Sequence, residues 1–318
     1  RFWATGELDQ NCNVQFGEGG AGTFSDGKLN TLVHDSNGRS QKVLELFVEY
    51  GAPKEILYQH KPHIGTDVLS RVVKNIREAI LSYGGEVRFL TQVTDILSEP
   101  AGEGRRLTAL QVYDHAAGKE DTIKTDIAVL AIGHSARDTF SMLLKNEIPM
   151  EAKSFAVGVR MEHPQAMIDE FQYGMKNDGT LPQASYKLTE NLACGRAYIP
   201  SACARGYVVN ASSEKNRLAV NGMSYHDRAG ENANSALIVT VNPEDFSCET
   251  KRGEGVHPLS GIHFQRELEE KAYEAGKGKI PVQLYGDFKN GKITESLAKY
   301  SRHFVGISVC KLEKNPPR

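Results

Sequence analysis

The sequence predicts a mixed α/β fold, and three observations support this prediction. Through residues 1–150, amphipathic helical patterns alternate with short strand patterns. A continuous apolar run at residues 127–132 is typical of a strand that is buried on both faces. From Glu151 onwards, longer strand patterns and irregular loops replace this alternation. We therefore expect two domains, at residues 1–150 and 151–318, which a chain of 318 residues can accommodate.

Three helices are expected in the first domain. Residues 40–50 place their apolar side chains on one side of a helix, and turn residues follow it. Thr66 can cap a longer helix with an apolar stripe, which the glycine pair at 84–85 ends. Ser135 can cap a third helix at about residues 137–145.

Strand patterns lie between the second and third helices. Short apolar and β-branched runs separated by turn residues occur at 86–89, 93–97, 107–113 and 122–124. A fifth strand, at 127–132, is expected to end at Gly133. Ligands of open α/β sheets bind at the carboxyl ends of strands, and the N-terminus of a following helix offers free N–H groups. We therefore expect a ligand near Gly133, with an ordinary strand-to-helix turn as the alternative.

Composition and charge narrow the class of protein. Hydrophobic residues make up 40% of the chain and charged residues 25%, and the formal net charge is -2, which are ordinary values for a soluble globular protein. A near-neutral charge argues against nucleic acid as a partner. No apolar run approaches the roughly 18 residues that span a bilayer, and no signal peptide opens the chain. We expect a cytoplasmic protein without a membrane span.

The cysteines and histidines do not predict a metal centre. Five cysteines are scattered without C-x-x-C pairs, which favours a reducing compartment over a zinc site. His60 and His63 bracket a Lys-Pro loop, and no third ligand accompanies them. We therefore expect no bound metal.

The stretch from Asn13 to Lys28 carries the strongest local signal, because five glycines fall within it. Residues 17–22 match the dinucleotide-binding pattern G-x-G-x-x-G, but no central strand precedes them and a turn sequence follows. The hydroxyls of Thr23 and Ser25 and the cation of Lys28 are interleaved with the glycines. We expect a loop whose backbone covers a ligand, with a surface glycine-rich loop as the alternative.

Two segments carry a specific resemblance: NVQFGEGGAGTFSDGKLNT, starting at Asn13, and AVLAIGHSARDTF, starting at Ala128. Together with KPHIGTDVL, GGEVRFLTQVTDI, NGMSYHDRAGENANSALIV and GIHFQRELEEKAY, they resemble the FAD-dependent dehydrogenases of the bacterial "NAD(FAD)-utilizing" type, in order and over almost the whole chain. The resemblance implies a two-domain FAD/NAD(P)-binding flavoprotein architecture. Members of that family carry a dinucleotide fingerprint upstream of the glycine-rich loop and a second FAD segment near the C-terminus. This chain has neither, so we expect a middle fragment of a longer enzyme.

The resemblance also implies FAD as the cofactor and assigns residues to it. The glycine-rich loop and the segment around residue 133 would pass the flavin, and the backbone at Val93 would approach the adenine end. The residues expected to bind FAD are Gly17, Gly19, Gly20, Ala21, Gly22, Thr23, Ser25, Lys28, Val93, Ala131, Gly133 and His134. NAD(P)H could serve as electron donor or acceptor, although no residue identifies its site.

Two residues are candidates for catalysis. The family equivalent of the KPHIGT loop lies near the flavin, so His63 could donate a hydrogen bond to the flavin or protonate a substrate. A structural loop histidine is the alternative. In the polar stretch 221–235, Arg228 would hold an anionic substrate, while Asn234 and Ser235 would line the flavin cavity. A solvated loop is the alternative there.

Two further features bear on the site. Arg160 and Glu162 alternate with apolar residues in a strand pattern, so they point either into a substrate cavity or to solvent. The family usually has a Cys-x-Cys-Pro-Gly-Gly type of loop where residues 201–206 read SACARG. If paired thiols carry redox chemistry in relatives, Cys203 alone cannot repeat it.

The resemblance and the residues together favour an FAD-dependent oxidoreductase. It would transfer hydride or electrons between the flavin and a small-molecule substrate whose identity the sequence does not reveal. A non-catalytic FAD-binding or structural fragment of such an enzyme is the alternative. An α/β hydrolase is disfavoured, because residues 133–137 read GHSAR and not G-x-S-x-G.

Overall fold

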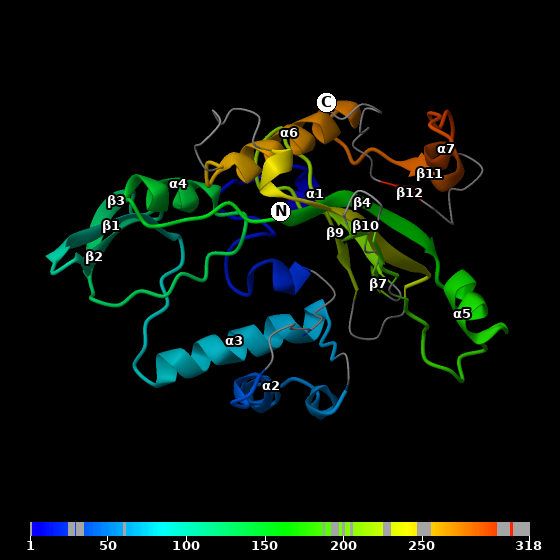
Figure 1. Cartoon of the computed structure of the whole chain (residues 1–318). Coiled ribbons are helices and arrows are strands. Elements are labelled where there is room, and N and C mark those ends of the chain that lie inside the picture. The colour runs from blue at the N-terminus through cyan, green and yellow to red at the C-terminus, as the bar shows by residue number, and fades with distance from the viewer. Residues whose placement is uncertain are drawn as a thin grey trace.

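Helices and antiparallel sheets alternate along the chain, which confirms the predicted mixed α/β fold class (Figure 1). The computed structural model describes residues 2–24, 29, 35–59, 62–186, 188–191, 197–198, 201–203, 206–224, 230–246, 256–297 and 306–307. Figure 1 shows a small sheet at one end, a larger sheet at the other, and a pair of helices below them.

The helix pair is formed by α2 (Arg39–Glu49) and α3 (Thr66–Ser82), as predicted from the apolar stripes. They enclose a small core, in which the buried residues are Ala52, Ile56, Ile64, Leu69 and Val72. Three short helical segments precede or join them: α1 (Phe2–Thr5), η1 (Gly20–Phe24) and η2 (Lys54–Leu57). η1 packs on α3, so the glycine-rich loop lies on this helical group.

Neither of the two predicted capping residues acts as a cap. Gly65, with a φ of 83°, occupies the N-cap position of α3, so Thr66 is already helical. Helix α4 (Arg137–Lys145) has the predicted bounds, but its N-cap is Ala136. Ser135 lies one residue too early, and its hydroxyl is 3.3 Å from Nε2 of His134. A side-chain cap needs its oxygen at the residue just before the first helical turn, and neither residue stands there.

The small sheet is an antiparallel meander of β1 (Thr91–Ala101), β2 (Gly104–Asp114) and β3 (Lys119–Lys124). These strands contain the runs predicted at 93–97, 107–113 and 122–124. The strand predicted at 86–89 is wrong, because this segment is a loop. The pairing of β1 with β2 begins at Thr91 opposite Asp114, and the turn at Leu90, with a φ of 53°, separates 86–89 from that ladder.

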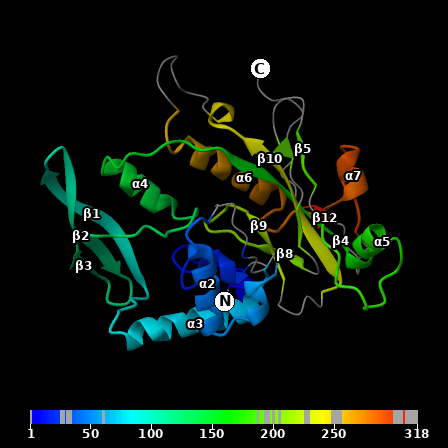
Figure 2. The same ribbon diagram turned by 60° about the horizontal axis from the view of Figure 1, so that its bottom comes forward.

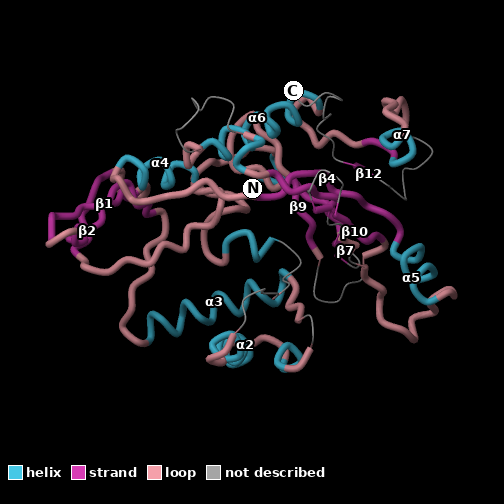
Figure 3. Tube along the Cα trace, viewed as in Figure 1, coloured by secondary structure: helices cyan, strands magenta, loops and turns pink. Residues whose placement is uncertain are grey.

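The strand predicted at 127–132 is also wrong. Residues 125–136 form an irregular connection from the small sheet towards α4 (Figure 3). Ile127, Val129 and Leu130 are 76%, 87% and 52% exposed, and no described strand pairs with this segment. A strand is stable only when a neighbouring strand accepts and donates its backbone hydrogen bonds. The apolar run therefore has strand composition without a strand partner.

The larger sheet is built on the long antiparallel pair β4 (Phe155–Pro164) and β10 (Asn232–Val241). The strand order is β11-β12-β4-β10-β6-β5, and β7 also pairs with β10. The remaining strands of this sheet are β5 (Glu190–Asn191), β6 (Ala197–Tyr198), β7 (Ser201–Cys203), β11 (Gln283–Leu284) and β12 (Gly306–Ile307). A separate hairpin of β8 (Tyr207–Asn210) and β9 (Val220–Met223) lies beside β4 and β10 (Figure 2).

Helices flank the larger sheet. α6 (Ser260–Ala275) is held against it by an aromatic cluster, in which Phe155 lies 5.3 Å from Phe246 and 6.2 Å from Phe264 between ring centroids. α5 (Gln165–Tyr173) follows β4 directly, and the shorter elements are η3 (Pro243–Asp245) and α7 (Tyr285–Lys289). Among the described residues, none of the helices has both the length and the apolar character needed to cross a bilayer.

Candidate functional site

Three loops that are distant in the sequence meet where the helical group approaches the β8–β9 hairpin. Nε2 of Gln15, at the start of the glycine-rich loop, donates a hydrogen bond to the backbone oxygen of Ala211 at 2.9 Å. Nε2 of His63 lies 3.3 Å from the hydroxyl of Ser224, just after β9. The glycine-rich loop, the His63 loop and the polar stretch that begins at residue 221 were each singled out from the sequence. The structure places them along one junction, with the glycine-rich loop at the Ala211 end of the hairpin and the His63 loop at its Ser224 end.

The glycine-rich loop is held in a defined conformation. Gly17, Gly19 and Gly20 have φ values of 91°, 78° and 51°, in the left-handed region that favours glycine. The buried Thr23 donates from Oγ1 to the backbone oxygen of Gly20 at 2.9 Å. A Cβ at Gly19 would lie 2.3 Å from Cγ2 of Thr23, so a side chain there would collide with Thr23 unless one of the two shifts. The glycines are therefore required by the loop itself, as well as by any ligand that it covers.

An ion pair fixes this loop to α3. Nε of Arg77 donates to Oε1 of Glu18 at 2.6 Å, and both side chains are about three-quarters buried. Since α3 also follows the His63 loop directly, one rigid helix positions two of the three loops.

His63 is buried, with 8% of its surface exposed, and its neighbour Ile64 is fully buried. The backbone oxygen of Pro62 accepts a hydrogen bond from the backbone N–H of Leu29 at 3.0 Å. The imidazole is thus buried and faces Ser224, the backbone before it is joined to Leu29, and it does not lie in a solvated loop. This geometry suits a hydrogen-bonding or proton-transfer role, although burial alone also fits a structural histidine.

The face of β4 and β10 that receives the hairpin carries a buried polar group. Arg160 donates from Nη1 to Oδ1 of Asn234 at 2.8 Å and from Nη2 to Oδ1 of Asn221 at 2.9 Å. Glu162 accepts hydrogen bonds from the backbone N–H of Val208 and, at 3.4 Å, from the amide of Asn232. Arg160 and Glu162 therefore point inward under the hairpin and not to solvent.

Burial affects the acid on this face. Removal of the Glu162 carboxyl from water raises its pKa, and the hydrogen bonds from Val208 and Asn232 offset only part of that effect. The face thus combines neutral amides, one guanidinium and a carboxyl group that is harder to ionise than usual.

The opposite face of the same two strands carries a second hydrogen-bonded chain. Nε2 of His163 lies 2.9 Å from the hydroxyl of Tyr186, which donates to Oγ of Ser235 at 2.9 Å. Burial lowers the pKa of His163 and raises that of Tyr186, so both are held in their neutral forms. Ser235 is fully buried in this chain, on the side of β10 away from Asn234.

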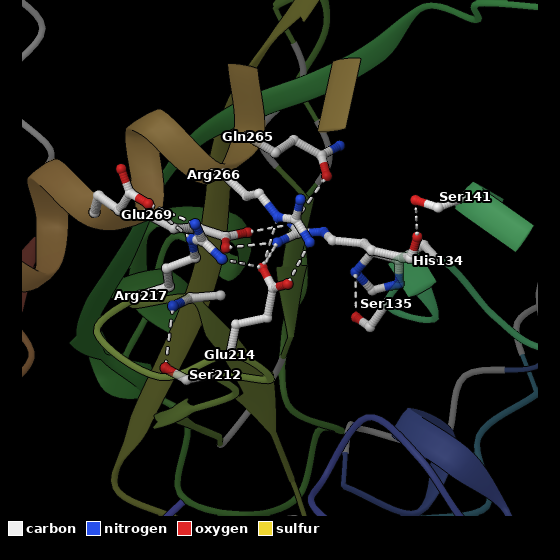
Figure 4. Close-up of polar contacts among 12 residues, drawn as sticks. His134, Ser135, Ser141, Ser212, Glu214, Arg217, Gln265, Arg266 and Glu269 are labelled. Carbon is white, nitrogen blue, oxygen red and sulfur yellow. Dashed lines mark hydrogen bonds and ion pairs between the residues drawn. The ribbon is translucent and has the colours of Figure 1, made fainter. Parts of the chain in front are cut away.

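A dense ionic cluster joins α4 to the second half of the chain (Figure 4). Arg137 is 4% exposed and donates to Glu214 and Glu269, and Arg266 and Arg217 also donate to Glu214. Burial alone would raise the pKa of Glu214, but hydrogen bonds and charge from Arg266 and Arg137 outweigh it and lower the pKa to about 2.

The histidine next to this cluster is also perturbed. Desolvation by the surrounding protein and the charge of Arg137 lower the pKa of His134, against a smaller opposing effect of Glu269. In Figure 4, His134 and Ser135 lie at the edge of the ionic cluster. The cluster explains the position of α4, and sequence patterns gave no sign of it.

The predicted FAD-binding residues do not all lie together. Val93 is on β1 in the small sheet, away from the glycine-rich loop in both Figure 1 and Figure 2. Ala131 and Gly133 are exposed in the irregular connection before α4, where the expected buried strand is absent. Ser25, Lys28 and Arg228 lie outside the described residues.

Sequence reasoning missed several residues that the structure places at the junction, on the opposite face of β4 and β10, or in the ionic cluster. They are Gln15, Asn221 as a partner of Arg160, Tyr186, Glu214 and Glu269. Asn221 stands in the polar stretch that was singled out, so its presence in the site could have been expected. The others pair with residues far away in sequence, and only the folded chain reveals such partners.

Two other features concern a cavity and metal binding. A cavity of about 850 Å³ is lined by the N-terminal segment 6–11, loop residues 214–218 and several neighbours, but not by His63, Asn234 or the glycine-rich loop. Within the described ranges, no group of three or more His, Cys, Asp or Glu side chains could hold a metal ion.

The architecture and the junction together define a mixed α/β protein whose polar loops meet at the edge of an antiparallel sheet. The family model described as "FAD-dependent protein, C-terminal domain-like" matches residues 154–318, more than half of the chain. The chain belongs to this FAD-dependent family. An uncharacterized protein of Clostridium beijerinckii (strain ATCC 51743 / NCIMB 8052) is 47% identical over 305 residues, which are 94% of this chain and 54% of that protein. The chain thus spans about half the length of this relative.

The donor set at the junction fits a flavin. An isoalloxazine ring is neutral when oxidised, and its pyrimidine edge presents carbonyl oxygens and one N–H. The junction offers matching hydrogen-bonding groups, among them the imidazole of His63, the hydroxyl of Ser224 and the amide of Asn234. The amide nitrogen of Asn234 is buried and has no partner within the described residues, which leaves one donor for a bound molecule.

Proposed function

We propose that this chain is part of an FAD-dependent oxidoreductase that binds the flavin at the junction of the glycine-rich loop, the His63 loop and the β8–β9 hairpin. Membership of an FAD-dependent family carries the proposal, and the contacts of the glycine-rich loop and the His63 loop with the two ends of the hairpin support it. When bound, FAD would accept hydride or electrons from a small-molecule substrate or deliver them to it. NAD(P)H is a candidate second cofactor.

The protein's part in this proposal is to bind and orient. The backbone N–H groups of the glycine-rich loop would lie along the flavin and stabilise negative charge near its N1–C2=O edge. His63, fixed against Ser224, would hold or move a proton at Nε2. Because the ring is buried, water would be excluded from this position.

A visible absorption spectrum tests the proposal. The purified chain is mixed with FAD, passed through a gel-filtration column and scanned near ~450 nm, where oxidised flavin absorbs. We expect a retained flavin band that dithionite bleaches, and NAD(P)H is then added to test for reduction. A colourless protein after gel filtration would contradict flavin binding by this chain.

A non-catalytic FAD-binding or structural role is the second candidate. The exposed apolar run at 127–130 favours it, because that segment has no strand partner among the described residues. The two functions differ in turnover: a structural fragment would retain flavin, but no added reductant or acceptor would exchange electrons with it faster than with free FAD. A serine-directed hydrolase probe should not label Ser135, whose hydroxyl lies against His134 from the adjacent residue.

A further inference from the structure

Asn234 has a side-chain amide whose orientation is determined by its partner. The residue is fully buried on β10, and its oxygen accepts a hydrogen bond from Nη1 of Arg160 at 2.8 Å. An arginine side chain carries only donors, so the oxygen of the amide, and not its nitrogen, must face Arg160. The nitrogen therefore points away from Arg160. In the part of the chain that the structure describes, this nitrogen is buried without a hydrogen-bond partner.

The guanidinium of Arg160 is itself fixed by a second asparagine. Its Nη2 donates to Oδ1 of Asn221 at 2.9 Å, and the same oxygen accepts the backbone N–H of Gly222 at 2.9 Å. The planar fork of arginine donates to both amides at once, which a single ammonium group cannot reproduce in this geometry. Arg160 therefore sets the direction in which the Asn234 nitrogen points.

Two glycines lie against this pair. A Cβ at Gly222 would lie 2.1 Å from Oδ1 of Asn234 and 2.5 Å from Nη1 of Arg160, so only glycine permits that hydrogen bond. A Cβ at Gly206 would lie 2.7 Å from Nδ2 of Asn234. The backbone of Gly206 therefore lies against the amide nitrogen, and a side chain at this position would collide with it.

A buried amide donor without an acceptor is unfavourable, and folded proteins pair most such groups. Here the donor is held in one direction and lies near the end of the hairpin that contacts His63 through Ser224. We propose that Nδ2 of Asn234 donates a hydrogen bond to a carbonyl oxygen of the bound isoalloxazine ring, and that Arg160 is the positioning residue that aims this donor. This inference rests on the proposed flavin binding.

Nuclear magnetic resonance of the side-chain amides tests the inference directly. The chain is labelled with ¹⁵N-asparagine, and the Asn234 NH₂ signals are assigned by their loss in Asn234→Asp. Addition of FAD should move one Asn234 proton signal downfield in a saturable way. ADP, which shares the adenine and diphosphate but lacks the flavin ring, should leave it in place.

The outcomes separate the inference from the proposed function. If the chain retains FAD but the Asn234 signals do not move, the inference is wrong and flavin binding stands. A shift with ADP as well would assign the acceptor to another part of the cofactor and also overturn the inference. If the chain does not retain FAD, both fail for this chain.

Two variants test the positioning role. Asn234→Asp keeps the acceptor for Arg160 but removes the donor, and it should weaken FAD binding by about tenfold, the effect of one buried hydrogen bond. Arg160→Lys keeps the charge but loses the fork, so FAD should still bind, more weakly, while the FAD-induced shift of the Asn234 signal disappears. An unchanged shift in Arg160→Lys would show that Arg160 does not aim the donor.

Discussion

Arg137 donates to both carboxylate oxygens of Glu269, from Nη1 to Oε2 at 3.0 Å and from Nη2 to Oε1 at 2.7 Å. This bidentate pair joins the start of α4 to the middle of α6, which lie more than a hundred residues apart in the sequence. It joins α4, next to the small sheet, to α6, which covers the larger sheet. The pair therefore holds these two parts of the chain together.

Replacement of Arg137 should therefore destabilise the fold. In Arg137→Met, the carboxylate of Glu269 stays partly buried and loses the two hydrogen bonds that Arg137 supplied, so we expect the free energy of unfolding to fall by about 3 kcal/mol. Urea unfolding, monitored by circular dichroism, measures this change in the free energy of unfolding. The matched control is Arg106→Met, which removes the exposed pair with Glu99 and should cost less than about 1 kcal/mol. Equal losses of stability in the two variants would show that the buried Arg137–Glu269 pair stabilises the fold no more than an exposed pair does.

The same cluster predicts a pH dependence. The pKa of Glu214 is about 2 in the folded chain, below its ordinary value of 4.5. A carboxyl with a lowered folded pKa contributes stability that is fully present above its unfolded pKa and is lost as the pH falls through the folded value. Stability should therefore fall between about pH 5 and pH 2, by up to ~3 kcal/mol from this group.

Glu214→Gln isolates that contribution. The variant should be less stable than the parent chain at pH 7, and the difference between the two should shrink as the pH falls. Unfolding midpoints in urea at a series of pH values provide the comparison. A difference that stays constant with pH would mean that Glu214 ionises normally in the folded chain.

The glycine-rich loop gives a third prediction. In Gly19→Val, the new side chain would meet Thr23 in a conformation that disfavours any residue except glycine. We expect flavin retention after gel filtration to be lost, in the chain or in a full-length protein that contains it, with far-UV circular dichroism nearly unchanged. The double replacement of Gly19 and Gly20 by valine should have the same effect. Retention of flavin in these variants would make the loop a surface feature.

The exposed apolar segment gives a fourth prediction. Val129 is 87% exposed, so Val129→Ala should change the free energy of unfolding by less than about 0.5 kcal/mol. Val112, on β2, is 2% exposed, and Val112→Ala should cost about 2 kcal/mol through lost burial and a residual cavity. Chemical denaturation of both variants tests this contrast. A cost at Val129 close to that at Val112 would show that the segment is packed after all.

Local patterns in the sequence determined much of the fold. The apolar stripes of 40–50 and of the helix after residue 66 place α2 and α3, because a helix exposes one face to the core every three to four residues. The bounds of α4 and the three strands of the small sheet follow from similar local preferences. The loops that form the junction were also recognisable, since glycine-rich and polar stretches need a structural or functional reason.

Only the tertiary structure decided which of these segments meet. The apolar run at 127–132 has the composition of a buried strand, but strand formation depends on a neighbour, and no described strand pairs with it. Likewise, nothing in the sequence pairs Arg137 with Glu269, His63 with Ser224 or Arg160 with Asn234. Local preferences are set by a residue and its near neighbours, whereas a buried charge or amide takes the partner that the folded chain places beside it.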